Sequence, residues 1–227
     1  MIIETFVLTP FQQNTRVVSC DVTRKAICID PGEPSQEVVD YIRANDLDLQ
    51  AIVITHGHLD HCGGVTALAS EFPAADIVLH YEEMYLYEKL REQPLLLGIM
   101  PDQARVLGMD YEDPPQPTRF VEDRDVLEVG TLRFLVRHVP GHTLGHIVLA
   151  EQEEKAVFTG DCLFSGTIGR TDLPGGDYDQ LIASIKEKVL TLGDDFTVYC
   201  GHGPETTIGR ERATNPFLTG VYLPSMR

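Results

Sequence analysis

The stretch from Ala51 to Gly64 constrains what this chain can fold into more than any other part of the sequence. It opens with the apolar, β-branched run AIVI, which is typical of a buried strand. The run leads into a loop with four potential metal ligands within six positions, namely His56, His58, Asp60 and His61. Glycines beside them leave the backbone free to turn these side chains inward. The stretch therefore predicts a strand, a loop that carries part of a metal site, and then a helix from Val65.

Three later motifs carry further potential ligands. They are PGHTLGH at 140–146, TGDC at 159–162 and CGHG at 200–203. Each motif follows a strand-like run, so we expect the three loops to converge with the first one on an edge of a sheet. A polar surface loop with clustered histidines is the alternative interpretation of the first stretch. That alternative leaves the three matching motifs unexplained.

Seven side chains in these motifs are candidate ligands, and none is a cysteine. Structural zinc sites are closed and usually rich in cysteine, whereas catalytic sites use histidine and carboxylate and keep a position for water. Seven ligands exceed what one tetrahedral ion needs, and two ions that share one carboxylate fit the count. The candidates are His56, His58, Asp60, His61, His142, Asp161 and His202.

We expect these ligands to divide between two ions. The first ion takes His56, His58 and His142, the second takes Asp60, His61 and His202, and Asp161 bridges the two. We also assign a catalytic role to Asp60. Two ions about 3.5–4 Å apart can share a hydroxide and polarise a carbonyl, and zinc lowers the pKa of its bound water to about 7. The motifs therefore predict a metal-dependent hydrolase, and the sequence contains no G-x-S-x-G element of a serine hydrolase.

Composition bounds the partners and the location. The net charge of -17 argues against binding to nucleic acids or to anionic membranes, so we expect a small-molecule substrate and leave the oligomeric state open. The five cysteines include no C-x-x-C pair, which does not indicate a disulfide framework. The first residues lack the pattern of a signal peptide, and no apolar run approaches membrane-spanning length. We expect a cytoplasmic protein.

The length suits one domain, residues 1–227, with an insertion at about 81–118. Strand patterns dominate the start of the chain, and helical patterns separate the later strands, which suggests two packed sheets with helices outside. The residues that follow Ser35 and the range 177–190 show helical spacing of apolar residues. Four side chains of the insertion either contact a substrate or pack the insertion on the core. They are Tyr85, Leu95, Leu96 and Leu97.

Other histidines and cysteines near the motifs have less specific roles. We expect His80, His138 and His146 to pack or to make hydrogen bonds rather than to bind metal. Cys62 and Cys162 each adjoin a candidate ligand. Because neighbouring side chains on an extended backbone point to opposite sides, we expect neither cysteine to bind metal.

The four motifs together resemble the metallo-β-lactamase superfamily, an α/β class whose fold is an αββα sandwich of two mixed sheets with helices outside. Within it, PFQQN at 10–14, SGTIGRTD at 165–172 and GHGPETT at 201–207 are similar to the short glyoxalase II-like hydrolases. This resemblance implies hydrolysis of a glutathione thioester such as S-lactoylglutathione. It also implies two divalent ions, with zinc as the first expectation and iron or manganese as alternatives.

By the same resemblance, Arg170 lies where glyoxalase II enzymes place a lysine that contacts glutathione, which implies a substrate-binding role. A salt bridge from Arg170 to Asp172 or Asp177 is the alternative. The alternative functions are a persulfide dioxygenase-like enzyme with one iron, a lactonase or a β-lactamase. A non-catalytic metal-binding protein on the same fold is a further alternative.

Overall fold

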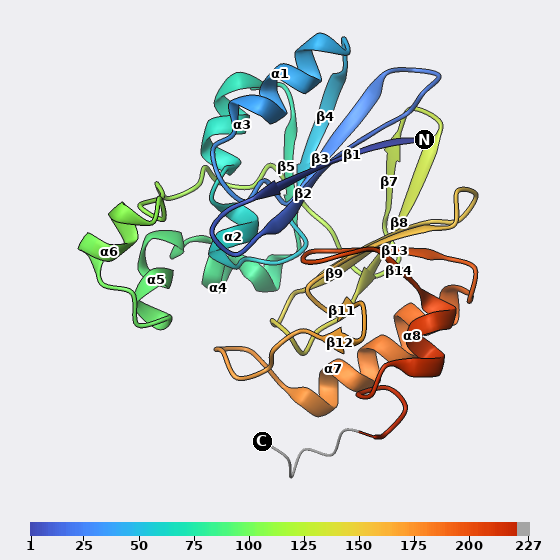
Figure 1. The fold of residues 1–227 in the computed structure, drawn as a ribbon. Helices are drawn as coiled ribbons and strands as arrows, with labels where there is room; N and C mark the ends of the chain where they lie inside the picture. The colour runs from blue at the N-terminus through green and yellow to red at the C-terminus, as the bar shows by residue number, and fades with distance from the viewer. Residues whose placement is uncertain (222–227) are drawn as a thin grey trace. The chain divides into compact units, whose positions relative to one another are not determined.

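The computed structural model describes residues 1–221, and the chain forms two compact units. The first unit comprises Met1–Val121 and Glu128–Leu132, and the second comprises Glu122–Leu127 and the chain from Arg133 onward. A six-stranded sheet accounts for most strands in each unit (Figure 1). The assignment of residues 1–227 to one domain stays a prediction.

The sheet of the first unit is mixed. Strands β1 to β3 pair antiparallel as successive hairpins, whereas β3 to β6 pair parallel. The order across the sheet is the order along the chain. The strands are β1 (Ile2–Leu8), β2 (Gln13–Ser19), β3 (Lys25–Ile29), β4 (Asp48–Val53), β5 (Asp76–Leu79) and β6 (Arg119–Phe120). The predicted apolar run is the end of β4, which places the histidine-rich loop directly after a central strand.

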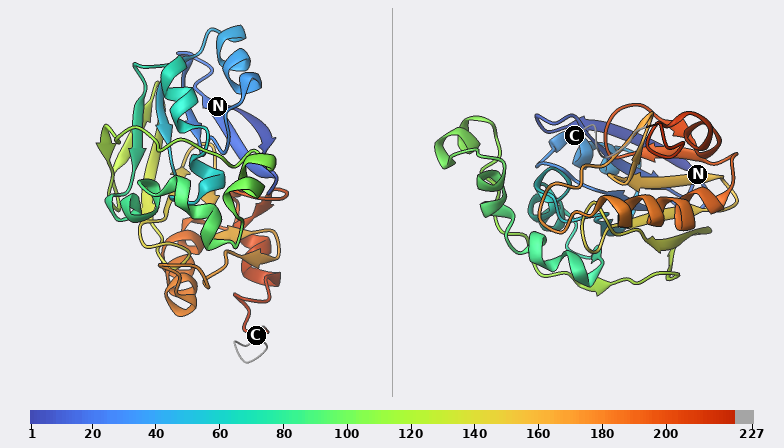
Figure 2. Two further views of the ribbon diagram at one scale, coloured as in Figure 1. Left: turned by 90° about the vertical axis from the view of Figure 1, so that its left-hand side faces the viewer. Right: turned by 90° about the horizontal axis from the view of Figure 1, so that it is seen from below.

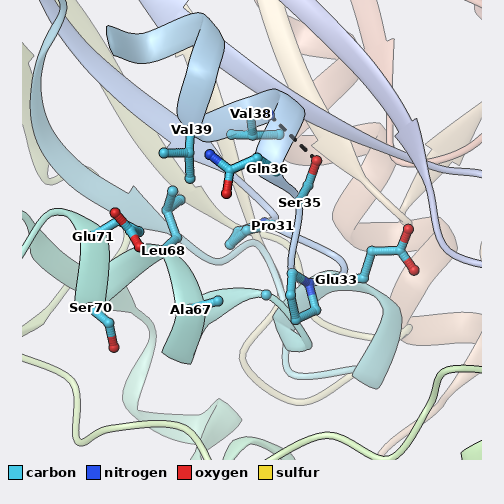
Figure 3. A pocket seen from close by; sticks show the side chains of 12 residues that line it. Pro31, Glu33, Ser35, Gln36, Val38, Val39, Ala67, Leu68, Ser70 and Glu71 are labelled. Carbon is cyan, nitrogen blue, oxygen red and sulfur yellow. Dashed lines mark hydrogen bonds between the residues drawn. The ribbon is translucent and has the colours of Figure 1, made fainter.

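Helices α1 (Gln36–Ala44) and α3 (Val65–Glu71) lie side by side in the first unit (Figures 1 and 2). Ser35 caps α1, because its hydroxyl accepts a hydrogen bond from the Val38 amide at 3.4 Å (Figure 3). The helical spacing expected after Ser35 is confirmed, since Val38, Val39 and Ile42 of α1 share a buried face. A groove of about 270 Å³ runs between the two helices and includes Pro31 and Leu68 (Figure 3). No predicted ligand lines this groove.

The segment at 81–118 contains short helices and, among the described residues, no strand. The residues from Tyr81 to Arg91 have an amphipathic pattern that predicts one helix. The prediction is wrong in its continuity, because the structure has three short elements there, η1 (Tyr81–Glu83), α4 (Met84–Tyr87) and η2 (Leu90–Glu92). Helices α5 (Gln93–Leu96) and α6 (Pro101–Val106) follow (Figure 2, green). Buried side chains fix the segment in the core of the first unit. They are Tyr87, Leu90, Ala104, Met109 and Tyr111.

The sheet of the second unit is also mixed, with order β14-β13-β10-β9-β8-β7. Only β10 and β13 pair parallel among the pairings measured in it. The strands are β7 (Val126–Val129), β8 (Leu132–His138), β9 (Ile147–Glu151), β10 (Ala156–Gly160), β13 (Thr197–Cys200) and β14 (Thr206–Thr207). A small hairpin, β11 (Leu163–Phe164) and β12 (Thr167–Ile168), forms a separate sheet that the sequence pattern did not predict.

Helices α7 (Tyr178–Ser184) and α8 (Ile208–Thr214) belong to the second unit. The predicted helix at 177–190 is regular only in α7, because it continues as a π-helical turn, η3 (Ile185–Val189), and a 3-10 turn, η4 (Leu190–Leu192). Apolar side chains from these helices share one core with the sheet. They include Leu181, Ile185 and Ile208 against Val157 and Val198.

The α/β class with two mixed sheets and helices is confirmed. Among the described residues, no helix combines the length and the hydropathy that a bilayer crossing requires.

Asp177 caps α7, since its side chain accepts a hydrogen bond from the Gln180 amide at 2.9 Å. Replacing this cap removes the partner of an otherwise unpaired amide in the first helical turn. We expect Asp177→Ala to lower the free energy of unfolding by about 1 kcal/mol. Asp177→Asn retains a capping side chain and is the matched control. Equal losses in both variants, measured by urea denaturation, would contradict the capping role.

Candidate metal centre

Four of the seven predicted ligands lie in the first unit, on the loop that follows β4. His56 and His61 are buried, whereas His58 and Asp60 are partly exposed. The ring centroids of His56 and His58 are 4.8 Å apart, and those of His56 and His61 are 4.1 Å apart. The Nε2 atom of His61 lies 3.9 Å from Oδ2 of Asp60. The loop therefore gathers the predicted ligands of the first unit in one place.

The buried carboxyl group of Asp30 organises this cluster. Its Oδ2 atom lies 2.9 Å from Nδ1 of His61 and accepts a 2.7 Å hydrogen bond from the hydroxyl of Thr55. Its Oδ1 atom accepts a hydrogen bond from the Thr55 amide, also at 2.7 Å. His61 therefore presents Nε2 as its metal-binding nitrogen, because a carboxylate that holds Nδ1–H fixes the tautomer of a ligating imidazole.

The same network sets the tautomer of His56. Its Nδ1 lies 3.0 Å from the Thr55 hydroxyl oxygen. Because Thr55 donates its only hydroxyl proton to Asp30, this oxygen accepts from Nδ1–H of His56. His56 then presents Nε2 for a metal, as His61 does. The sequence analysis missed Asp30, although its position at the end of a strand and before Pro31 was visible.

A helical turn, α2 (Leu59–Cys62), replaces part of the predicted loop. Cys62 lies on this turn, so the alternation of an extended backbone is the wrong reason for excluding it as a ligand. The structure supplies another reason, because the buried Sγ of Cys62 lies 3.5 Å from the carbonyl oxygen of His56. Burial raises the pKa of the Cys62 thiol well above its usual range, and neighbouring carboxylates, Asp30 first among them, raise it further. The thiolate, which is the metal-binding form, is therefore disfavoured.

The other three predicted ligands lie in the second unit, where Asp161 stands between two histidines. Its Oδ2 atom is 3.9 Å from Nε2 of His142 and 3.5 Å from Nε2 of His202. All three side chains line a pocket of about 420 Å³. One oxygen of Asp161 therefore faces two imidazole nitrogens, which suits the shared carboxylate that the sequence predicts.

The chain after Asp161 folds back and orients His142. The Nδ1 atom of His142 donates to the carbonyl oxygen of Arg170 at 2.7 Å, which leaves Nε2 directed toward Asp161. Gly169 permits this return, because a Cβ at that position would lie 1.9 Å from the carbonyl oxygen of Asp161. The site residue Asp161 is itself held in place, since its amide donates to Nε2 of His146 at 3.1 Å.

A second buried acid supports the wall of this pocket. Glu211 on α8 accepts hydrogen bonds from the Gly166 amide at 2.8 Å and from the Thr206 hydroxyl at 2.6 Å. Asn215 donates both to Glu211 at 2.9 Å and to the carbonyl oxygen of Thr167 at 3.0 Å. The β11–β12 hairpin lines the pocket with Phe164, Ser165 and Thr167, so this network fixes its shape. The sequence analysis did not single out Glu211 or Asn215.

The remaining histidines make local hydrogen bonds. His80 accepts from the Glu82 amide at 3.2 Å, and Nε2 of His138 lies 2.9 Å from the carbonyl oxygen of Leu144. With His146 bonded to the Asp161 amide, all three show the hydrogen bonds that the sequence analysis expected.

Arg170 forms a bidentate ion pair with Asp172, through Nε and Nη2 at 2.8 Å each. Asp177, the other expected partner, caps α7 instead. More than half of each side chain in the pair is exposed. Arg170 also lines the pocket of Asp161 and a neighbouring one of about 340 Å³ that includes Tyr178 and Phe217. It therefore retains access to both pockets while paired.

In the insertion, Leu95 and Leu96 are exposed, whereas Leu97 packs against the core of the first unit. Packing therefore accounts for Leu97, and Tyr85 is partly exposed.

We compared the sequence of this chain with known protein families to find the family to which it belongs. The family that matches is the Metallo-beta-lactamase superfamily, over residues 8–202. The chain belongs to this superfamily. The predicted resemblance and the predicted fold are thereby confirmed. At this level the chain is a metallo-hydrolase of the superfamily.

One relative within the superfamily has a specific name. The chain is 41% identical over 219 residues to "Hydroxyacylglutathione hydrolase GloC" of Haemophilus influenzae, a match that covers 96% of this chain and 98% of the relative. The narrower resemblance to glyoxalase II-like hydrolases is confirmed by this similarity.

Solved structures of the superfamily show the same fold. The BLEG-1 B3 metallo-beta-lactamase is 36% identical with a TM-score of 0.84, and the match covers 96% of this chain and 100% of the lactamase chain. TTHA1623, in a di-iron-bound form, is 36% identical with a TM-score of 0.81, at 95% and 100% coverage. ETHE1 from Myxococcus xanthus is 28% identical with a TM-score of 0.74, at 97% and 85% coverage.

Since Asp30 fixes the imidazole of His61, its charge should matter for metal binding. We expect Asp30→Asn to weaken the affinity for a metal ion by about 10–100-fold, the usual effect of losing a partner of a ligating histidine. Asparagine tolerates the positive φ of 52° at this position, so the backbone need not move. Competition with a chromophoric chelator measures the affinity. Asp40→Asn, on the exposed side of α1, is the control, and an equal effect there would contradict the role of Asp30.

Proposed function

We propose that this chain hydrolyses a glutathione thioester such as S-lactoylglutathione, with two divalent metal ions held by the seven predicted ligands. The arrangement of Asp161 carries this proposal, because one of its oxygens faces Nε2 of both His142 and His202. The similarity to a hydroxyacylglutathione hydrolase supports the substrate class.

The donor set fits metal ions of this kind. Three histidines, His56, His61 and His142, have Nδ1 occupied by a hydrogen bond to an oxygen atom, which leaves Nε2 as the metal-binding nitrogen. Imidazole and carboxylate ligands without thiolate suit a catalytic zinc centre. We propose zinc first, with iron as an alternative that the di-iron form of TTHA1623 supports, and manganese as another.

In this proposal the first ion is held by His56, His58 and His142, the second by Asp60, His61 and His202, and Asp161 bridges them. Such ions supply an activated water and polarise a carbonyl group when they are bound. Asp60 keeps its proposed catalytic role beside His61, where its carboxylate lies 3.9 Å from Nε2. The pocket beside Asp161 offers the apolar side chains of Phe164 and Pro204 for an acyl group.

We also propose that Arg170 binds a carboxylate of the substrate. A glutathione thioester is anionic, and the net charge of -17 opposes its approach, so a local cation is needed. The pair with Asp172 does not prevent this role. An exposed ion pair contributes only about 0.2–1 kcal/mol, so a substrate carboxylate can replace Asp172 at small cost.

The same charge supports a small-molecule substrate rather than a nucleic acid or an anionic membrane as the partner. A cytoplasmic location belongs to the same proposal. All five cysteines are free and buried, as a reducing compartment allows.

A substrate panel tests the proposed reaction. The zinc-loaded protein should release thiol from S-lactoylglutathione, detected with a thiol reagent, and should show no oxygen uptake with glutathione persulfide. A parallel assay with a chromogenic β-lactam addresses the second candidate, which the similarity to the BLEG-1 enzyme favours. Oxygen consumption by an iron-loaded sample without thioester cleavage would replace the hydrolase proposal with a persulfide dioxygenase. Faster cleavage of the β-lactam than of the thioester would replace it with a β-lactamase.

Two variants of the ion pair should affect the Michaelis constant differently. Arg170→Ala should raise KM for the glutathione thioester about 10-fold with kcat nearly unchanged, because it removes a charged hydrogen bond that substrate and transition state share. Asp172→Asn should leave KM equal or lower it, since it releases the guanidinium. Steady-state kinetics and thermal unfolding measure both effects. Reduced stability in both variants with KM unmoved would mean that the pair only shapes its loop.

A further inference from the structure

Gly57 lies between His56 and His58, and two side chains of the insertion bind its backbone amide and its backbone carbonyl oxygen. The Gly57 amide donates to Oε2 of Glu83 at 2.5 Å. The Gly57 carbonyl oxygen accepts from Nε2 of Gln93 at 2.7 Å. We call the contacts of Glu83 and Gln93 with Gly57 the clamp. Gln93 also donates to the carbonyl oxygen of Leu86 at 3.0 Å, which connects the clamp to α4.

Both clamping side chains are buried, although glutamate and glutamine are usually exposed. The exposed fraction is 0% for Glu83 and 3% for Gln93. A buried carboxylate is costly unless it receives hydrogen bonds. The bond from the Gly57 amide is charge-assisted and belongs to the stronger kind. Removing one side of the clamp would leave a buried amide or carbonyl group of Gly57 without its partner, an expensive change for the loop.

The absence of a side chain at Gly57 allows this close approach. A Cβ there would lie 2.8 Å from Cβ of Leu86 and 3.1 Å from Oε2 of Glu83. The insertion is thus packed directly against this peptide. The rings of His56 and His58 lie close together, with centroids 4.8 Å apart and planes at 88°. The two contacts hold the peptide planes on either side of Gly57, and a rotation of either plane would change the relation between these rings.

The contacts of Asp30 and Thr55 act on this loop in a different way. Asp30 and Thr55 hold His56 and His61 through their rings. Glu83 and Gln93 act on the backbone that joins His56 to His58. In the proposed ligand set these two histidines serve the same ion, whereas Asp60 and His61 serve the other. The clamp therefore has a predicted effect on one ion and not on both.

We propose that Glu83 and Gln93 are positioning residues for the metal site, which hold His56 and His58 in the geometry that the first ion needs. This inference rests on the proposed ligand set. It gives the insertion at 81–118 a task in metal binding besides any role in substrate contact. Neither residue touches the substrate or the reacting atoms in this role.

The test is a titration of the metal-free full chain with Zn²⁺ in competition with a chromophoric chelator. The wild type should bind two ions. Glu83→Met fills a similar volume but cannot accept the bond from the Gly57 amide. It should weaken one binding step about 10–100-fold, the usual effect of losing a supporting partner, and should leave the other step within about threefold. The weakened step should be the one that His58→Ala abolishes, not the one that His202→Ala abolishes.

Two further variants separate positioning from general stability. Glu83→Gln keeps an oxygen that accepts from the Gly57 amide, so it should restore most of the lost affinity. Glu88→Gln, at an exposed position of the insertion, should leave both steps unchanged. If Glu83→Met does not fold, Gln93→Met tests the same peptide from its carbonyl side and should weaken the same step.

The outcomes distinguish this inference from the proposed function. Two Zn²⁺ ions with both steps unchanged in Glu83→Met, or both weakened equally, would overturn the clamp. A wild type that binds a single ion would overturn the two-ion proposal instead. In that case the clamp still predicts a loss in Glu83→Met if His58→Ala abolishes binding of that ion, and an unchanged affinity would overturn it.

Discussion

An imidazole ring binds a metal only through a nitrogen that carries a lone pair, and the structure fixes which nitrogen that is. In three histidines, Nδ1 is hydrogen-bonded to an oxygen atom. The partner is the Thr55 hydroxyl for His56, the Asp30 carboxylate for His61 and the Arg170 carbonyl group for His142. Thr55 directly precedes His56 in the same loop, whereas Asp30 and Arg170 lie in other segments of the chain. The conformation of the loops therefore determines the chemistry of the ligands, since a shifted loop would change the tautomer as well as the position of a ring.

Buried acids hold these loops in both units. Asp30 accepts from the Thr55 amide, Glu83 from the Gly57 amide, and Glu211 from the Gly166 amide. The exposed fractions of the three residues are 2%, 0% and 0%. A carboxylate accepts several hydrogen bonds at once, and those from backbone amides offset the cost of burying its charge. The strands position the loops, and the hydrogen bonds from backbone amides to these acids fix the conformation of each loop.

Sequence patterns point to candidate ligands but not to the residues that support them. Helix α1 follows Ser35, and α7 lies within the helical range expected at 177–190. The candidate ligands stand out because four histidine and aspartate residues in six positions are rare. The burial of Asp30, Glu83 and Glu211 could not be predicted, because 23% of the chain is charged and a single acid gives no signal of burial. The helical turn α2 and the β11–β12 hairpin are too short for a period to appear, so the pattern left both as loop.

The supports also explain how the fold can keep its ligands while its specificity changes. Phe164, Ser165 and Thr167 line the pocket beside Asp161, and hydrogen bonds to Glu211 and Asn215 fix their hairpin. The Phe164 ring lies edge-to-face with that of the candidate ligand His202, at a centroid distance of 6.1 Å. Substitutions of Ser165 or Thr167 can therefore alter the shape of the pocket while this ring contact is kept. The insertion differs in this respect, because it offers exposed Leu95 and Leu96 and also holds the Gly57 peptide. A change in its length or packing would reach His56 and His58 through the bonds to Gly57, so under the proposed ligand set its effects on specificity and on metal binding are coupled.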